Sequence, residues 1–230
     1  MSAIMFRRLW LLSPALIMCL LVIAPSFTHA DDVCESTVRF IPVGVEIYPG
    51  EVEYFNKYDR AYLAKKLSTS KTISKAGWVP SGMTSVGFGY SIHLSVQVRQ
   101  MSSGLFCSEL SEVEARVGYD SVGVYIASDY APGSCQYDSV LEHEHVHVGI
   151  YQQSLVEYAS LIEKELRKAI ERQESVITDH SDIAVKILQA RIEKPLKFLI
   201  NKIDKTLKKR NAALDTIENY KKELGNCSSW

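Results

Sequence analysis

The residues best suited to chemistry form one short stretch, His143-Glu144-His145-Val146-His147. Two histidines four residues apart lie on one face of an α-helix, so both imidazoles can reach a single metal ion. The glutamate that follows the first histidine falls about 100° further round the helix. Its carboxylate can there take a proton from a water molecule at the metal. The spacing predicts a zinc site with His143 and His147 as ligands and Glu144 as general base.

This stretch lies near the start of a long segment with helical character. From about Tyr137 the composition shifts towards Glu, Lys, Leu and Ala, and no proline occurs between Gly133 and Lys194. Residues at helical spacing form one stripe that includes both expected ligands: Val140, His143, His147, Ile150, Ser154, Tyr158 and Leu161. His145 points to the opposite side, so we expect it in solvent and not on the metal.

A catalytic zinc ion needs a third protein ligand besides an open position for water. The same helix cannot supply it, because a residue two turns further on is about 11 Å away. The polar segment Thr178–Asp182 is the expected reversal, after which a second helix would run to about Leu224 with a kink at Pro195. In this hairpin Glu218 lies within the apolar stripe of the second helix and is the preferred third ligand. Asp215, nearer the edge of that stripe, is the alternative.

The part before the helices has strand-like patterns. Apolar and polar residues alternate in Val43–Ile47, Ile92–Val98, Val113–Val117 and Val122–Ile126, which favours a small, mainly antiparallel sheet with one wet face. A short helix is expected from Val52 to Leu67. The predicted fold class is α+β, with this mainly antiparallel N-terminal sheet followed by a long antiparallel helical hairpin that carries the histidines.

The first thirty residues have the features of a secretory signal peptide. Arg7 and Arg8 precede an apolar run from Leu9 to Ala24, and Thr28–Ala30 provides a small-residue cleavage pattern. No later segment is apolar enough to cross a membrane. We therefore expect a periplasmic or secreted protein that does not span the membrane after cleavage.

After cleavage, residues 31–230 would form one domain, mainly strands over 31–135 and helical over 136–230. Removing Arg7 and Arg8 from the 26 basic residues leaves 24 against 27 acidic ones. This mildly acidic balance gives no electrostatic reason to expect nucleic acid as a partner.

The cysteines agree with export. Cys34, Cys107, Cys135 and Cys227 follow the signal peptide, and an even count in an exported chain predicts two disulfides. The hairpin register brings Cys135 opposite Cys227, which would leave Cys34 to pair with Cys107. The competing pairing, Cys107–Cys135 with Cys34–Cys227, stays open.

The stretch Val140–Val148 resembles the active-site helix of zincin metallopeptidases. Those sites favour Val or Thr three residues before the first histidine and uncharged residues between the glutamate and the second histidine. The layout of Val38–Tyr151 also resembles a bacterial family of predicted secreted zinc-dependent proteases, in which short strands and a cysteine precede the motif helix. The chain lacks the G-x-x-H of metzincins after His147, and it lacks a glutamate helix at the short thermolysin spacing.

The resemblance implies Zn²⁺ as cofactor and a peptide or protein substrate, such as a component of the cell envelope. It also implies that an edge strand, Ile92–Val98, holds the peptide by strand addition. The function expected is an exported zinc metallopeptidase with Glu144 as general base. The alternative is a non-catalytic periplasmic zinc-binding or helical interaction protein, which would have no use for Glu144 and would close the fourth zinc position with a protein ligand.

Overall fold

The computed structural model describes residues 33–36, 40–69 and 79–230. All of the described residues belong to one compact unit, Asp31–Trp230. The expected signal peptide and Val38, the start of the family-like segment, lie outside the described residues. Within the described part, no helix is long and apolar enough to cross a membrane.

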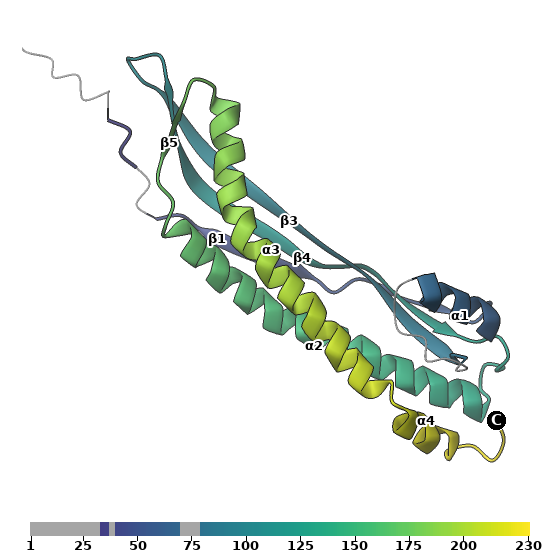
Figure 1. Cartoon of the computed structure of the whole chain (residues 1–230). Coiled ribbons are helices and arrows are strands. Elements are labelled where there is room, and N and C mark those ends of the chain that lie inside the picture. The colour runs from purple at the N-terminus through teal and green to yellow at the C-terminus, as the bar shows by residue number, and fades with distance from the viewer. Residues whose placement is uncertain (1–32, 37–39, 70–78) are drawn as a thin grey trace, which may run out of the picture. The chain divides into compact units, whose positions relative to one another are not determined.

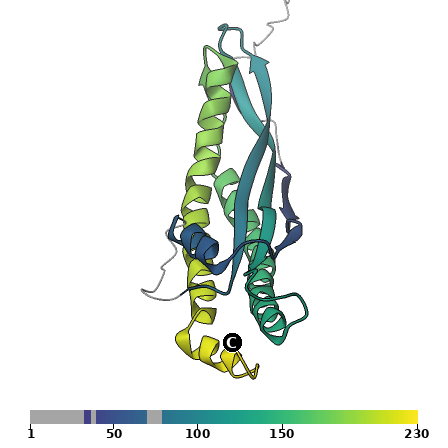
Figure 2. The same ribbon diagram turned by 90° about the vertical axis from the view of Figure 1, so that its right-hand side faces the viewer.

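The sheet is built around one long strand, β4 (Phe106–Ile126, 21 residues). Along one edge it pairs antiparallel with β3 (Gly82–Gln100), and Figure 2 shows these two strands twisting about one another. On its other edge β5 (Val176–Thr178) pairs antiparallel, whereas β1 (Val43–Tyr48) and β2 (Val52–Phe55) pair in parallel. The path β1–β4–β2 of this five-stranded sheet is therefore parallel.

The prediction of a mainly antiparallel N-terminal sheet is wrong, because β1 and β2 run parallel to β4. Alternating hydrophobicity fixes which side chains are buried, but not the direction of the neighbouring strand. Two of the expected strands, Val113–Val117 and Val122–Ile126, are parts of the single strand β4. Gly118 between them is no turn: a Cβ there would overlap the carbonyl oxygen of Tyr48, so glycine lets β1 lie against β4.

Strands β1 and β2 follow one another along β4 in the same register. They are separated at Pro49-Gly50, where Gly50 has a φ of 74°, a left-handed conformation that favours glycine. The helix expected from Val52 to Leu67 is accordingly wrong in its first part. Val52–Phe55 is β2, and helix α1 runs from Arg60 to Thr69.

Two long helices come after β4 in the chain (Figure 1). Helix α2 (Cys135–Ile170) and helix α3 (Ser181–Leu214) pack against each other and against β4. The predicted hairpin of two continuous helices is wrong, because β5 joins the sheet between them and the second helix is interrupted. The chain breaks helical conformation at Asp215-Thr216 and continues as a separate helix, α4 (Ile217–Leu224).

The main core lies between β4 and the two long helices. Alternate residues of β4 point into it, and apolar residues of α2 and α3 at helical spacing close it from the other side. The buried members include Val113, Val117, Val122 and Val124 from β4, Leu155, Ile162 and Leu166 from α2, and Ile192, Leu196 and Ile203 from α3. Fully burying an aliphatic side chain contributes about 1.5–3 kcal/mol. The core therefore holds α2, with its histidines, firmly on the sheet.

Candidate metal centre

Helix α2 places the motif residues one turn apart near its N-terminus. Ser134 caps this helix, because its hydroxyl accepts a hydrogen bond from the backbone N–H of Tyr137. His143, Glu144 and His147 are buried, with exposed fractions of 6 %, 4 % and 6 %. They lie on the side of α2 that faces the rest of the protein, so their polar atoms must find partners there.

His145 lies on the outer side of α2, as the helical periodicity predicts. It is exposed, and its Nε2 is 3.0 Å from the hydroxyl of Tyr54. It therefore has no part in the cluster formed by the other two histidines of the motif.

The third member of the cluster is Asp215, at the break between α3 and α4. Asp215 ends α3 with a ψ of 58°, and Thr216 then caps α4 by accepting a hydrogen bond from the backbone N–H of Asn219. This change of direction brings Oδ1 of Asp215 to 3.2 Å from Nε2 of His143 and 3.1 Å from Nε2 of His147. The two Nε2 atoms are 3.2 Å apart.

These three atoms form a nearly equilateral triangle. In a tetrahedral site with ligands at about 2.1 Å, neighbouring ligand atoms lie about 3.4 Å apart. The triangle of His143, His147 and Asp215 has sides of 3.1–3.2 Å, close to that value. The three residues therefore fit a small tetrahedral cation, and among the described residues they are the group able to hold one.

Hydrogen bonds fix which ring nitrogen of each histidine carries the proton. The side-chain amide of Asn211 donates through Nδ2 to the carbonyl of Leu207, so its Oδ1, 2.7 Å from Nδ1 of His147, must accept. A carboxylate oxygen of Glu223 lies 2.6 Å from Nδ1 of His143 and also accepts. Both neutral rings therefore carry their proton on Nδ1 and present a lone pair on Nε2.

Three electron-pair donors, Nε2 of His143, Nε2 of His147 and Oδ1 of Asp215, thus converge at hydrogen-bonding distance. Such an arrangement needs a positive charge at its centre, either a metal ion or protons. In the metal-free protein, burial lowers the pKa of His143. Hydrogen bonds to Asp215 and Glu223, together with the charge of Glu144, outweigh this effect and raise the pKa to about 9. Burial also lowers the pKa of His147, but the hydrogen bond to Asp215 and the charges of Glu144 and Asp215 outweigh it and raise the pKa. That of Asp215 is lowered, because its hydrogen bonds to both rings outweigh burial.

Glu144 is held between α2 and the beginning of β3. The hydroxyl of Thr84 donates to its Oε2 at 2.8 Å, and a Cβ on Gly82 would lie only 2.6 Å from its Oε1. Burial raises the pKa of Glu144 to about 7, although the nearby charges of His147 and His143 oppose this rise. Glycine at position 82 therefore leaves the space that this carboxylate occupies.

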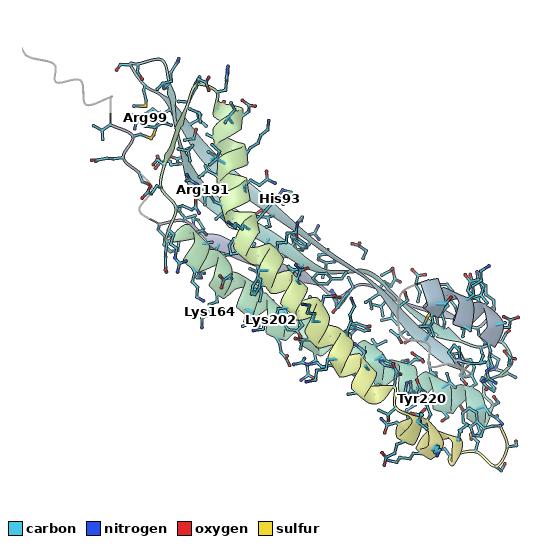
Figure 3. The ribbon with its side chains drawn as sticks, in the orientation of Figure 1. His93, Arg99, Lys164, Arg191, Lys202 and Tyr220 are labelled. Atoms are coloured by element: carbon cyan, nitrogen blue, oxygen red, sulfur yellow. A yellow bond between two sulfur atoms is a disulfide. The ribbon has the colours of Figure 1, made fainter. Side chains whose placement is uncertain are left out.

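Helix α4 covers one side of the cluster. The hydroxyl of Tyr220 (Figure 3) donates to Oδ1 of Asp215 at 2.7 Å, and its ring stacks on His143 with centroids 5.1 Å apart. Burial and the Asp215 charge raise the pKa of Tyr220. None of the residues of α4 is buried. The helix is therefore held by its contacts with the cluster and by the Cys135–Cys227 disulfide, which ties the start of α2 to the segment after α4.

The structure brings together three of the expected site residues, His143, Glu144 and His147. It does not bring Glu218 to them: this residue is exposed in the first turn of α4. Asp215, the alternative third ligand, takes that place. The prediction that Glu218 faces inwards assumed one continuous second helix. The break before α4 changes the helical phase, so Glu218 faces solvent instead.

Sequence reasoning missed the residues around the ligands, namely Thr84, Asn211, Tyr220 and Glu223. A local signal was available for the helix break. Asp215-Thr216 followed by Asn219 is a capping sequence, since Thr216 can accept from the N–H three residues later.

The disulfides are Cys34–Cys107 and Cys135–Cys227. This is the first of the two pairings that the sequence left open. Disulfides persist in oxidising compartments outside the cytosol, so two of them are compatible with an exported protein.

Comparisons of the chain with family models, with curated proteins and with solved structures found no match. The likeness to zincins therefore rests on the motif residues.

Proposed function

We propose that this protein is an exported zinc-dependent metallopeptidase. One observation carries the proposal: His143, His147 and Asp215 direct three electron-pair donors at one point, beside the buried carboxylate of Glu144. A structural zinc site closes its fourth position with a protein ligand, whereas a catalytic site leaves it open. The side chain of Asp215 is 40 % exposed, so the cluster is open to solvent on that side.

The donor set favours zinc over the alkaline-earth ions, which prefer oxygen ligands. Two imidazoles and one carboxylate also suit non-haem iron(II), so the ligands alone do not select hydrolysis. The position of Glu144 is what favours hydrolysis. Hydrolysis requires a base next to the metal, and Glu144 lies one residue from a ligand with its charge coupled to both imidazoles.

Bound zinc supplies Lewis acidity, which lowers the pKa of water and polarises a carbonyl. Glu144 accepts the proton of the attacking water and returns it to the leaving amine. The Thr84 hydroxyl holds Oε2 of this carboxylate, which leaves Oε1 for the proton. Glu223 and Asn211 keep the two imidazoles in the tautomer that presents Nε2 to the metal.

A peptide substrate would lie along the start of β3. Among the described strands β3 pairs only with β4, so its other edge can receive an extended chain. Thr84 on β3 touches Glu144, whereas Ile92 is eight residues further on, about 26 Å along the strand. The segment that borders the cluster is therefore the one around Thr84, and not Ile92–Val98.

The test is cleavage of a mixed peptide library by the mature, disulfide-bonded protein loaded with zinc. Glu144→Gln should keep the zinc and lose about 10²–10⁴-fold in cleavage rate. His145→Gln is the matched control, because it alters an exposed side chain in the same turn of α2 and should leave both properties unchanged. Stoichiometric zinc without any cleavage by the unaltered protein would instead support the non-catalytic zinc-binding protein.

A further inference from the structure

The outward face of α3 carries a row of lysines. Lys194, Lys197, Lys202, Lys205 and Lys209, here called the basic stripe, are all exposed; Lys202 is labelled on this helix in Figure 3. Within the described part of the chain no ion pair involves any of the five. Their charges therefore stay available to a partner.

The charge of α3 is segregated from that of the rest of the chain. Ser181–Leu214 contains nine Lys and Arg against three Asp and Glu, although the whole chain has 26 and 27. Two of these three acidic residues form ion pairs with lysines outside the basic stripe: Asp182 with Lys186, and Asp204 with Lys208. The basic stripe is thus left as an unbalanced positive surface.

An exposed phenylalanine lies within the basic stripe. Phe198 is 76 % exposed, more than any other large apolar side chain in the described part. At 100° per residue, Lys194, Phe198 and Lys205 fall within about 40° of one direction. The opposite side of α3 holds the core residues Ile192, Leu196 and Ile203. Phe198 therefore points away from the core, among positive charges.

We propose that α3 docks lengthwise on an anionic lipid surface, with the basic stripe on the headgroups and Phe198 inserted between them. From Lys194 to Lys209 the stripe extends about 22 Å along a helix, so a flat surface can contact all of it. A helix with lysines on its polar side and an aromatic side chain at the interface is typical of such binding. A soluble polyanion would neutralise the lysines but would leave the Phe198 ring in water.

The test is flotation of the mature protein with phosphatidylcholine vesicles, with or without phosphatidylglycerol. The protein should float with the anionic vesicles and not with the neutral ones, and added salt should release it. Lys194→Glu/Lys205→Glu should weaken binding at least about tenfold. The matched control is Lys164→Glu/Arg172→Glu, which makes an equal charge change at two exposed positions, one within the second half of α2 and one just after its end. This control should keep most of the vesicle binding.

Phe198→Ser separates lipid from other polyanions. This variant should also lose vesicle binding, while its weak binding to heparin should equal that of the unaltered protein. The proposal is overturned if the control variant loses as much as the stripe variant. It is likewise overturned if Phe198→Ser binds vesicles as well as the unaltered protein does. Zinc content and peptide cleavage, measured on the same variants, should be unchanged, so this result is independent of the proposed catalytic function.

Discussion

Replacing Glu223 by Gln tests whether α4 contributes to the metal centre. The Glu223 carboxylate accepts the Nδ1–H of His143 at 2.6 Å, and the His143 side chain is only 4 % exposed. The substitution keeps the size of the side chain and an accepting oxygen but removes the charge. We expect weaker zinc binding without unfolding, because α4 buries no residue in the core.

The magnitude follows from the kind of contact that is lost. Removing a hydrogen-bonding partner of a metal ligand typically weakens metal binding about 10–100-fold, or roughly 1.4–2.7 kcal/mol. A charge-assisted hydrogen bond is about twice as strong as a neutral one. Glu223→Gln should therefore weaken zinc binding about tenfold. Glu223→Ala, which removes the acceptor, should weaken it by nearer a hundredfold.

The assay is competition for zinc with a chromogenic chelator at fixed pH. Glu218→Gln is the matched control, since it makes the same change on the same short helix at an exposed position. Its zinc affinity should equal that of the unaltered protein within about threefold. If Glu218→Gln weakens zinc binding and Glu223→Gln does not, the role assigned to α4 is refuted.

Three further predictions concern the surroundings of the cluster. Gly82→Ala should retain zinc but lose most cleavage, because its Cβ would displace the Glu144 carboxylate; equal cleavage by both proteins would contradict this. Cys135→Ser/Cys227→Ser should lower the free energy of unfolding by about 4 kcal/mol in urea titrations and weaken zinc binding; an unchanged zinc affinity would show that α4 stays in place without the disulfide. The raised pKa of His143, about 9, stabilises the metal-free fold below about pH 6.5 and ceases to do so as pH rises through 9. Metal-free stability should therefore fall, and zinc affinity rise, over this range; parallel pH trends would contradict the assignment.

The candidate ligands on α2 could be placed from the sequence because helical periodicity alone puts them on one face. His143 and His147 share a face wherever the helix lies, and Glu144 follows from the same geometry. The third candidate ligand depends on how the second helix approaches α2, and this is determined by the break in helical conformation at Asp215-Thr216. Because Thr216 caps a new helix, Asp215 and not Glu218 turns towards α2.

The sheet could be predicted only in part. The alternation in Val113–Val117 identifies a strand with one buried face, but pairing direction depends on contacts distant in sequence. Gly118 lies between two of the expected strands, yet it belongs to the continuous strand β4 and lets Tyr48 approach that strand. The spacing of apolar residues in Val52–Leu67 indicated a helix, although its first part is strand β2. Four residues are too few to distinguish the period of a strand from that of a helix.

The most direct test of the central claim is the zinc content of the mature protein beside Asp215→Ala and Glu218→Ala. The proposed site predicts one zinc per chain in the unaltered protein and in Glu218→Ala, and loss of tightly bound zinc in Asp215→Ala. Full zinc occupancy in Asp215→Ala, or no zinc in the unaltered protein after metal is added, would contradict the site formed by His143, His147 and Asp215.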